Sequence, residues 1–136
     1  MKVLVDTPVW SYALRSKRVG FEAHVEALRG LIVDHRVLLI GPVRQEVLSG
    51  YSDLARFEVL KSKLSAFDNV QIVDYDYIQA ALFSNICRKQ GVQGSHIDFL
   101  ICAVASRLNV EIFTSDRDFD FYRQHLPIKL FSVSRN

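Results

Sequence analysis

Short apolar runs alternate with longer segments of helical periodicity along the whole chain. Four runs predict strands, at 2–6, 36–40, 110–114 and 128–131, and a weaker strand is expected at 70–73. The first run is short, rich in β-branched residues and stopped by Thr7-Pro8, which is typical of a buried strand. No repeat, low-complexity tract or linker interrupts the pattern.

The segments between these runs predict helices. Apolar residues recur at helical spacing from 21 to 34, and further helices are expected at 43–49, 74–90, 96–108 and 116–124. Pro8 can occupy the first turn of a helix after the first strand, and Ser52 is expected to cap a helix that runs to about residue 67. Ser95, with Asp98 three residues on, resembles a capping box with Asp in place of Glu.

The order of these elements predicts the fold class. Strands separated by helices of this length pair in parallel through right-handed crossovers. We therefore expect an α/β fold with a central parallel sheet of four to five strands and helices on both faces, in a single domain over residues 1–136. Cys87 and Cys102 lie in apolar helical stretches, outside any CxxC or Cys/His pattern, and are expected to be buried free thiols.

Neither a membrane span nor a signal peptide is expected. The longest apolar stretches, such as 37–40 and 99–105, are far shorter than the roughly 20 residues that cross a bilayer. Met1-Lys2 leads directly into the first strand, which leaves no room for a signal peptide. A cytoplasmic protein with no membrane partner is the prediction.

Four carboxylates are expected at one edge of the sheet. Asp6 ends the first strand, Asp116 follows the strand at 110–114, and Glu46 and Asp98 lie early on their helices. In open α/β sheets, ligand sites form outside the carboxyl ends of the strands. Each acid alone could be a helix cap or a solvated surface residue, but their common edge favours a functional site.

Clustered carboxylates indicate a cation. Converging acids repel one another unless cations neutralise them or some of them protonate. Mg²⁺ or Mn²⁺ is the natural choice, because both prefer oxygen ligands and no Cys/His set favours zinc. One or two such ions can activate water and stabilise the entering and leaving oxygens at phosphorus. The inferred chemistry is phosphodiester hydrolysis.

The charge distribution is compatible with a polyanionic substrate. The net charge is +2, but once the four proposed site acids are set aside from fifteen, seventeen basic residues face eleven acids. A mildly positive exterior around an acidic centre suits nucleic acid. A solvated surface of mixed charge explains the same count, so the charge permits this function without indicating it.

Four motifs together resemble a known family, the PIN-domain nucleases, and most closely the VapC-type toxins of toxin–antitoxin pairs. The motifs are Val3-Leu-Val-Asp6-Thr7-Pro-Val-Trp10, Arg44-Gln-Glu46-Val-Leu, His96-Ile-Asp98-Phe-Leu-Ile-Cys-Ala103 and Thr114-Ser-Asp116-Arg-Asp118-Phe119. None is specific alone, but the four lie in family-like order and spacing over essentially the whole chain. The resemblance implies a PIN-like three-layer α/β/α fold.

The resemblance also implies residue roles. Asp6 and Asp98 match the principal metal ligands of the family. Glu46 matches its second acid, which binds metal or orients a metal-bound water. Asp116 matches a position that completes the cluster.

Further positions support or compete with these acids. Thr7 and Thr114 match hydroxyl positions that hydrogen-bond the site. Asp118 and Asp120 lie close to Asp116, and either could share or replace its role.

The activity and partners that the resemblance implies are those of a toxin. We expect an endoribonuclease that uses Mg²⁺ or Mn²⁺ and leaves a 3′-hydroxyl and a 5′-phosphate. We also expect a homodimer, inhibited by a small VapB-type antitoxin whose C-terminal segment fills the groove. Which RNA is cut stays open, because target choice depends on surface shape and loop contacts.

A basic group near the predicted site could hold the RNA backbone. Its members are Arg15, Lys17, Arg18, Arg44 and Arg117. Two alternatives stay open: Arg44 or Arg117 could approach the acids only to neutralise them, and the pair at 17–18 could be a solvated loop.

Three rival functions fit the sequence less well. A phosphatase of the haloacid dehalogenase type needs a second acid at position 8, where this chain has Pro8. A phosphate-accepting receiver domain needs a lysine after its last strand, whereas Lys129 lies inside the predicted strand. The stronger rival is a catalytically inactive PIN-like module that binds RNA or protein, but such a loss normally replaces the carboxylates and all four are present.

Overall fold

Five short strands form one parallel sheet in the described part of the chain, residues 1–14 and 20–133 of a computed structural model. The strands are β1 (Val3–Val5), β2 (Val37–Ile40), β3 (Asp68–Val70), β4 (Glu111–Phe113) and β5 (Lys129–Leu130). Their order across the sheet is β3-β2-β1-β4-β5, and every pairing is parallel. Val3 of the central strand lies beside Val37 on one side and Glu111 on the other. The predicted parallel sheet is confirmed.

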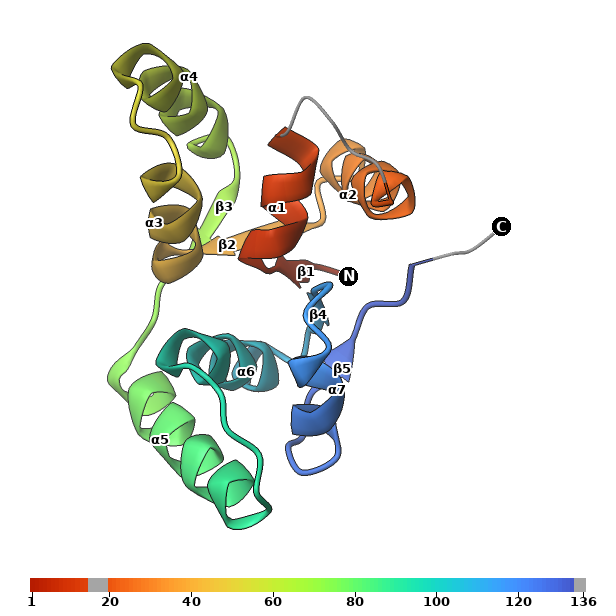
Figure 1. The fold of residues 1–136 in the computed structure, drawn as a ribbon, viewed down its shortest axis with the longest axis vertical. Helices are drawn as coiled ribbons and strands as arrows, with labels where there is room; N and C mark the ends of the chain where they lie inside the picture. Colours follow the sequence, from red (N-terminus) through yellow and green to blue (C-terminus); the bar gives the residue numbers. More distant parts are fainter. Residues whose placement is uncertain (15–19, 134–136) are drawn as a thin grey trace.

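Helices cover both faces of the sheet. They are α1 (Thr7–Leu14), α2 (Glu22–Val33), α3 (Gly41–Ser49), α4 (Leu54–Leu64), α5 (Asp74–Lys89), α6 (His96–Leu108) and α7 (Asp118–Arg123). The chain runs from β1 to β3 in one direction and from β3 to β5 in the other, so right-handed crossovers place the two helix groups on opposite faces. Figure 1 shows α1–α4 on one side of the sheet and α5–α7 on the other. The three-layer α/β/α architecture is therefore confirmed.

The core lies where α1 and α6 press on the central strands. All three residues of β1 have an exposed fraction of 0%. Trp10 of α1 packs against Phe67 with ring centroids 5.1 Å apart. The stretch 99–105 of α6 is buried throughout, which explains why this helix is apolar on all sides. Both cysteines are buried free thiols, as predicted.

Several predicted boundaries were wrong. The helix expected at 43–49 begins at Gly41, and the helix expected to run to about residue 67 ends at Leu64. The strand expected at 70–73 begins at Asp68, and its polar residues are tolerated because β3 is an edge strand where Lys2 reaches Asp68 at 2.9 Å. Asp53, not Ser52, caps α4 by accepting from the backbone N–H of Arg56. α7 begins at 118 rather than 116, because residues 114–117 form the turn after β4. The cap of α6 was predicted correctly: the Ser95 hydroxyl accepts from the Asp98 N–H at 3.1 Å.

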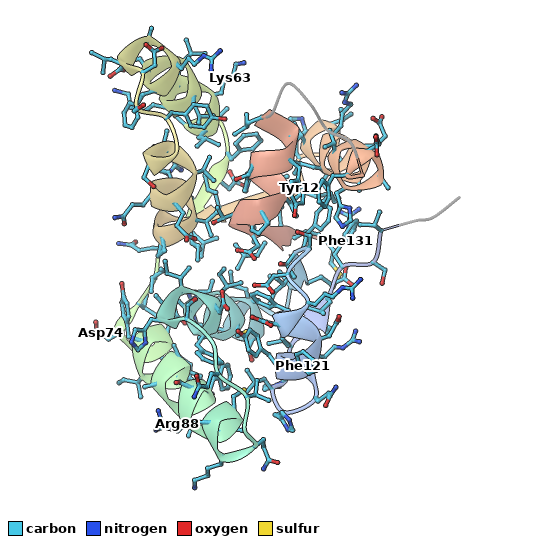
Figure 2. The ribbon with its side chains drawn as sticks, in the orientation of Figure 1. Tyr12, Lys63, Asp74, Arg88, Phe121 and Phe131 are labelled. Atoms are coloured by element: carbon cyan, nitrogen blue, oxygen red, sulfur yellow. The ribbon has the colours of Figure 1, made fainter. Side chains whose placement is uncertain are left out.

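α5 and α6 are joined by an ion pair that is buried on the Asp76 side and partly exposed on the Arg107 side. Asp76 is 0% exposed, and Arg107 of α6 contacts both of its carboxylate oxygens, at 2.7 and 2.9 Å. Figure 2 shows Asp74 at the start of α5 and Arg88 at its end, charges that complement the helix dipole. Among the described residues, no helix is long and apolar enough to span a bilayer.

Candidate active site

The predicted acids lie around the switch point of the sheet. β1 and β4 are neighbours, although the chain leaves β1 toward β2 and reaches β4 from β3. The crevice outside the carboxyl ends of two such strands is where α/β sheets bind ligands. Asp6 follows β1 directly, and its backbone N–H still donates to the Phe113 carbonyl of β4 at 2.9 Å. This pairing fixes Asp6 at the centre of the edge.

Asp6 is a buried carboxylate held by two uncharged donors. It is only 4% exposed, and it accepts from the Thr7 N–H at 2.8 Å and from the Thr114 hydroxyl at 2.9 Å. The pKa of Asp6 is raised to about 6, mainly by burial. The two hydrogen bonds lower the pKa, and the charges of Asp98 and Glu46 contribute a smaller part of the rise. The pKa shows that Asp6 lies close enough to both acids to be repelled by them.

Two threonines connect Asp6 to its neighbours. The Thr7 hydroxyl donates to Glu46 Oε1 at 2.8 Å, so the side chain of α3 is tied to the start of α1. The Thr114 hydroxyl, besides donating to Asp6, accepts from the Asp116 N–H at 3.0 Å. The structure therefore places both threonines where the sequence predicted hydrogen bonds to the site.

Asp98, Asp116 and Asp118 form a compact acid group. One carboxylate oxygen from each lies within 4.8 Å of those of the other two. The Asp118 N–H donates to Asp116 Oδ1 at 2.9 Å, which folds the start of α7 over the loop. Burial raises the pKa of Asp98, hydrogen bonds from Tyr122 and Ser95 oppose the rise, and the Asp116 charge adds to it.

This group bears on the acid that the sequence left open. Asp116 and Asp118 both belong to the group with Asp98, whereas Asp120 does not. Asp98 and Asp116 are half-buried and Asp118 is exposed, so the group opens to solvent on the Asp118 side. Asp118 therefore lies where it could bind a cation itself, whereas the sequence predicted only a supporting role for it.

Tyr122 is a site residue that the sequence analysis missed. Its side chain on α7 is 0% exposed, and its hydroxyl donates to Asp98 Oδ2 at 2.7 Å. Burial raises the pKa of Tyr122 above its usual range, and the hydrogen bond and negative charge of Asp98 add to this, so the hydroxyl stays a donor. Its position one helical turn after Asp118 was the available signal, but nothing local connects it to Asp98.

Comparison with known proteins identifies the family. The family model described as PIN domain matches residues 3–123. The chain belongs to the PIN domain family. No curated protein sequence matches the chain significantly.

Solved structures share the PIN fold over nearly the full chain. The FitAcB structure from Neisseria gonorrhoeae superposes with a TM-score of 0.74 at 20% identity, covering 96% of each chain. VapBC2 from Rickettsia felis, bound to a DNA fragment from its promoter, gives 0.76 at 16% identity, covering 98% of this chain and 100% of that one. VapBC-1 from nontypeable Haemophilus influenzae gives 0.76 at 15% identity, covering 97% and 98%. Identities this low establish the fold and no more.

The donor set of this PIN domain fits a hard divalent cation. Asp98, Asp116 and Asp118 offer carboxylate oxygens alone, close together and open to solvent on one side. Oxygen-only donors suit Mg²⁺ or Mn²⁺ rather than zinc. Burial raises the pKa of Asp6, and the charges of Asp98 and Glu46 add a smaller rise, so a nearby cation would favour its ionised form. Asp98, Asp116 and Asp118 could hold a cation. Asp6 and Glu46, which were also expected to be metal ligands, are not part of this compact group.

Of the predicted basic residues, the structure describes Arg44 and Arg117, which lie in different parts of the fold. Arg117 is exposed in the turn between Asp116 and Asp118. Arg44 is half-buried and donates to the Asn69 side chain at 3.4 Å. Asn69 belongs to β3, which is separated from β1 by β2 in the sheet. Arg15 and Lys17, with Arg18, lie outside the described residues, so the prediction for them stands as made from the sequence.

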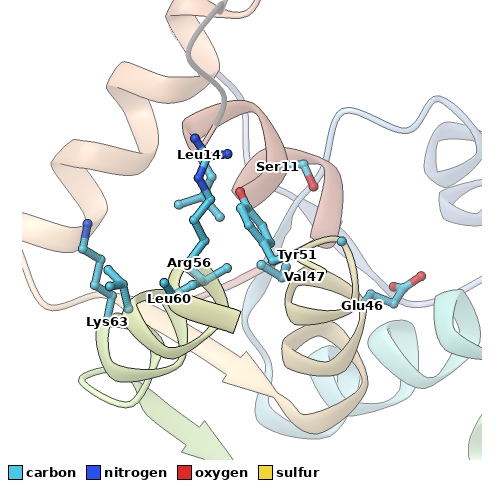
Figure 3. A pocket seen from close by; sticks show the side chains of 11 residues that line it. Ser11, Leu14, Glu46, Val47, Tyr51, Arg56, Leu60 and Lys63 are labelled. Carbon is cyan, nitrogen blue, oxygen red and sulfur yellow. The ribbon is translucent and has the colours of Figure 1, made fainter. Parts of the chain in front are cut away.

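A groove of about 920 Å³ in this PIN domain is lined by Glu46, one of the four predicted site acids. It runs between α1, α3 and α4 over an apolar floor that includes Val47 and Leu60. Figure 3 shows Glu46 at one end of the groove and Lys63 at the other, with Arg56 near the basic end. The groove thus connects Glu46 of α3 to the basic side chains of Arg56 and Lys63 on α4.

Proposed function

We propose that this PIN domain is a metal-dependent endoribonuclease that hydrolyses RNA phosphodiester bonds and acts as the toxin of a toxin–antitoxin pair. The observation that carries the proposal is the convergence of Asp98, Asp116 and Asp118 at the switch point of the sheet, beside the buried Asp6. Membership of the PIN domain family supports the nuclease class.

The acids would have two different roles in binding the metal ion. Asp98, Asp116 and Asp118 would hold Mg²⁺ or Mn²⁺, and Asp6 would add negative charge from beneath the group. When bound, the ion would neutralise phosphate charge and lower the pKa of a water molecule. Because Asp98 and Asp116 come from different elements, the fold itself brings the ligands together.

Glu46 is placed to accept a proton. The Thr7 hydroxyl occupies its Oε1 atom at 2.8 Å and so fixes the carboxylate, while Oε2 is left for an attacking water. Glu46 is exposed at the rim of the groove, where such a water and an RNA strand can both approach. Arg117, exposed between two acids of the group, is placed to contact a neighbouring phosphate.

An antitoxin is the proposed inhibitor. The neighbouring structures are VapBC complexes and FitAcB, and a VapB-type antitoxin is the corresponding partner for this chain. The groove of Figure 3 supports this, since its apolar floor fits a peptide segment and Glu46 lies at its end. A segment bound there would cover Glu46 and exclude RNA.

A homodimer is part of the same proposal. Tyr75, Ile78 and Leu82 of α5 are 57%, 69% and 48% exposed and follow one face of the helix. An apolar stripe of this kind is typical of an interface rather than of a solvated helix. The other face of α5 packs on α6, which leaves the stripe free for a second copy.

The experiment that tests the function is RNA cleavage by the protein freed of antitoxin. A mixture of structured RNAs is incubated with and without Mg²⁺ or Mn²⁺, in parallel with Asp6→Asn and Asp98→Asn. Asp34→Asn, an exposed acid at the end of α2, is the matched control. We expect specific fragments that need metal, persist in the control and disappear in both site variants.

The alternative outcome favours a different class of protein. RNA that is retarded in a gel but stays intact under every condition would indicate a binding module without catalysis. The presence of all four predicted acids in the sequence favours the enzyme, because loss of activity normally replaces them.

A further inference from the structure

A buried tyrosine connects the two halves of the acid group. Asp98 lies in the first turn of α6, whereas Asp116 and Asp118 lie in the loop after β4 and at the start of α7. Tyr122, also on α7, donates from its hydroxyl to Asp98 Oδ2 at 2.7 Å. This bond therefore crosses between the two elements whose acids must meet.

The Tyr122 ring cannot move freely. It is 0% exposed, and its centroid lies 5.1 Å from that of Phe99 and 5.0 Å from that of Phe119. Both partners are themselves buried, so the three rings form part of the core between α6 and α7. Close packing of this kind fixes the hydroxyl in one place.

Gly94 provides the space for this hydroxyl. A Cβ atom at Gly94 would lie 2.2 Å from the Tyr122 hydroxyl oxygen, 2.7 Å from Cζ of the same ring and 3.0 Å from Cζ of Phe99. Gly94 does not adopt a left-handed backbone, so the close approach and not the conformation requires glycine. The next residue, Ser95, caps α6 through the Asp98 N–H. The segment before α6 thus fixes both the backbone and the carboxylate of Asp98.

We propose that Tyr122 is a positioning residue that holds the Asp98 carboxylate in the orientation needed to share a divalent cation with Asp116 and Asp118. Gly94 preserves the space in which it does so. The inference rests on the proposed metal-dependent nuclease function, which it deepens. A carboxylate has roughly four lone-pair sites, so one hydrogen bond leaves room for a cation. A neutral donor also orients the acid without adding a positive charge that would compete with the metal.

The test measures metal affinity separately from stability. Mn²⁺ binding to the full chain is followed by titration calorimetry, and unfolding by urea in chelator. Tyr122→Phe removes only the hydroxyl, and Tyr77→Phe, at an exposed position on α5, is the matched control. We expect Tyr122→Phe to weaken Mn²⁺ binding by about 10-fold, the lower end for losing a partner of a metal ligand. The control should bind as the wild type does.

A purely structural role gives a different result. Tyr122→Phe would then lower the urea midpoint but keep the wild-type Mn²⁺ affinity, and this outcome overturns the inference. If the wild type itself binds no Mn²⁺, the proposed function fails and the inference fails with it. If the wild type binds Mn²⁺ and Tyr122→Phe binds it equally well, the role given to Tyr122 is overturned while the proposed function stands.

Gly94→Ala supplies an independent variant. Its methyl group must displace the Tyr122 hydroxyl, so we expect weaker Mn²⁺ binding here too. In the Tyr122→Phe background the same change should cost little further affinity, since the contact with Asp98 is already lost. Unchanged affinity in Gly94→Ala, or losses that add fully in the double variant, would contradict the role given to Gly94. If Tyr122→Phe does not fold, wild-type affinity in Gly94→Ala overturns the inference by itself.

Discussion

At the scale of single residues, Asp6 lies in an environment that disfavours its negative charge. The carboxylate is 4% exposed, and its donors Thr7 and Thr114 carry no charge. Two hydrogen bonds do not offset the burial and the neighbouring acids, so its pKa is raised to about 6. A buried acid in this state is stabilised either by a proton or by a metal ion.

The first prediction concerns stability against pH without metal. The folded-state pKa of Asp6 is about 6, and its ordinary value is 3.8. The contribution of Asp6 to the free energy of unfolding is therefore at its maximum below about pH 3.8, where the carboxyl is neutral in both states. This contribution is lost as the pH rises through about 6. From pH 4 to pH 8 in chelator, the free energy of unfolding should fall by about 2 kcal/mol relative to Asp6→Asn. Urea unfolding of both proteins at several pH values measures this difference.

Metal provides the control for that prediction. Adding Mn²⁺ at pH 8 should restore stability to the wild type and much less to Asp6→Asn. A difference between the two proteins that does not vary with pH would show that Asp6 keeps an ordinary pKa.

The second prediction separates the acids that follow β4. Asp118 shares the acid group with Asp98 and Asp116, but Asp120 does not. Asp118→Asn should therefore weaken Mn²⁺ binding by at least about 10-fold, while Asp120→Asn leaves it unchanged. Calorimetric titration of both variants decides the question, and equal losses would extend the site to Asp120.

At the scale of elements, the pairing of α5 with α6 matters because α6 carries Asp98. Asp76 of α5 is 0% exposed and accepts two bonds from Arg107 and one from the Val73 N–H. Burial alone would raise the pKa of Asp76, but these bonds and the Arg107 charge lower it on balance. The ion pair thus fixes the helix on which a proposed ligand lies.

The third prediction is that Arg107→Leu destabilises the fold by about 3 kcal/mol, because it leaves a buried charge unpaired. Asp76 has a lowered pKa, so its contribution is present above its ordinary pKa of 3.8 and is lost as the pH falls through the lower folded value. The difference between wild type and variant should therefore narrow in strong acid. Urea unfolding at neutral and acid pH measures it.

An exposed ion pair is the matched control for Arg107. Lys61 lies 2.8 Å from Glu58 with side chains that are 56% and 53% exposed. Lys61→Ala should change the free energy of unfolding by less than about 1 kcal/mol. Equal effects at Arg107 and Lys61 would mean that the buried pair contributes no more than a solvated one.

At the scale of the whole molecule, the functional surfaces lie on different sides of the sheet. The groove is bounded by α1, α3 and α4, and the apolar stripe belongs to α5 in the opposite layer (Figure 1). The proposed antitoxin segment and the proposed second copy would therefore not compete for the same surface. The acids lie at the sheet edge between these layers, where RNA can reach them.

The fourth prediction tests the dimer. Ile78→Asp places a charge in the middle of the stripe and should convert a dimer into a monomer in sedimentation velocity at micromolar concentration. Val33→Asp, at a residue that is 70% exposed on α2, is the control and should leave the dimer intact. A wild type that is monomeric, or an Ile78→Asp variant that stays dimeric, would place the interface elsewhere or remove it.

Local pattern was enough to predict the sheet, the helices and the family. Apolar runs of strand length separated by helical periodicity admit few arrangements other than a parallel sheet covered on both faces. Asp6, Glu46, Asp98 and Asp116 could be named because each lies at a recognisable junction, just after a strand or within the first turns of a helix. Signals of this kind are local, since they depend on neighbours in the chain.

The ends of the helices and strands were predicted less reliably, because they depend on more than neighbouring residues in the chain. β3 uses Asp68 and Asn69, polar residues that no strand pattern favours, because an edge strand needs backbone pairing more than burial. Either Ser52 or Asp53 can cap a helix, and the geometry of the incoming turn selects the second.

What the sequence determined by itself is the kind of fold and the chemical character of its site, because hydrophobic period and residue type are properties of short segments. Tertiary structure decided which acids lie close together, namely Asp98, Asp116 and Asp118. It also decided that burial raises the pKa of Asp6, and that the Tyr122 hydroxyl donates to Asp98, 24 residues away in the sequence. Those facts depend on distances between α6, α7 and the two central strands. Such distances are set by the packing of the whole core and leave no mark on any single segment.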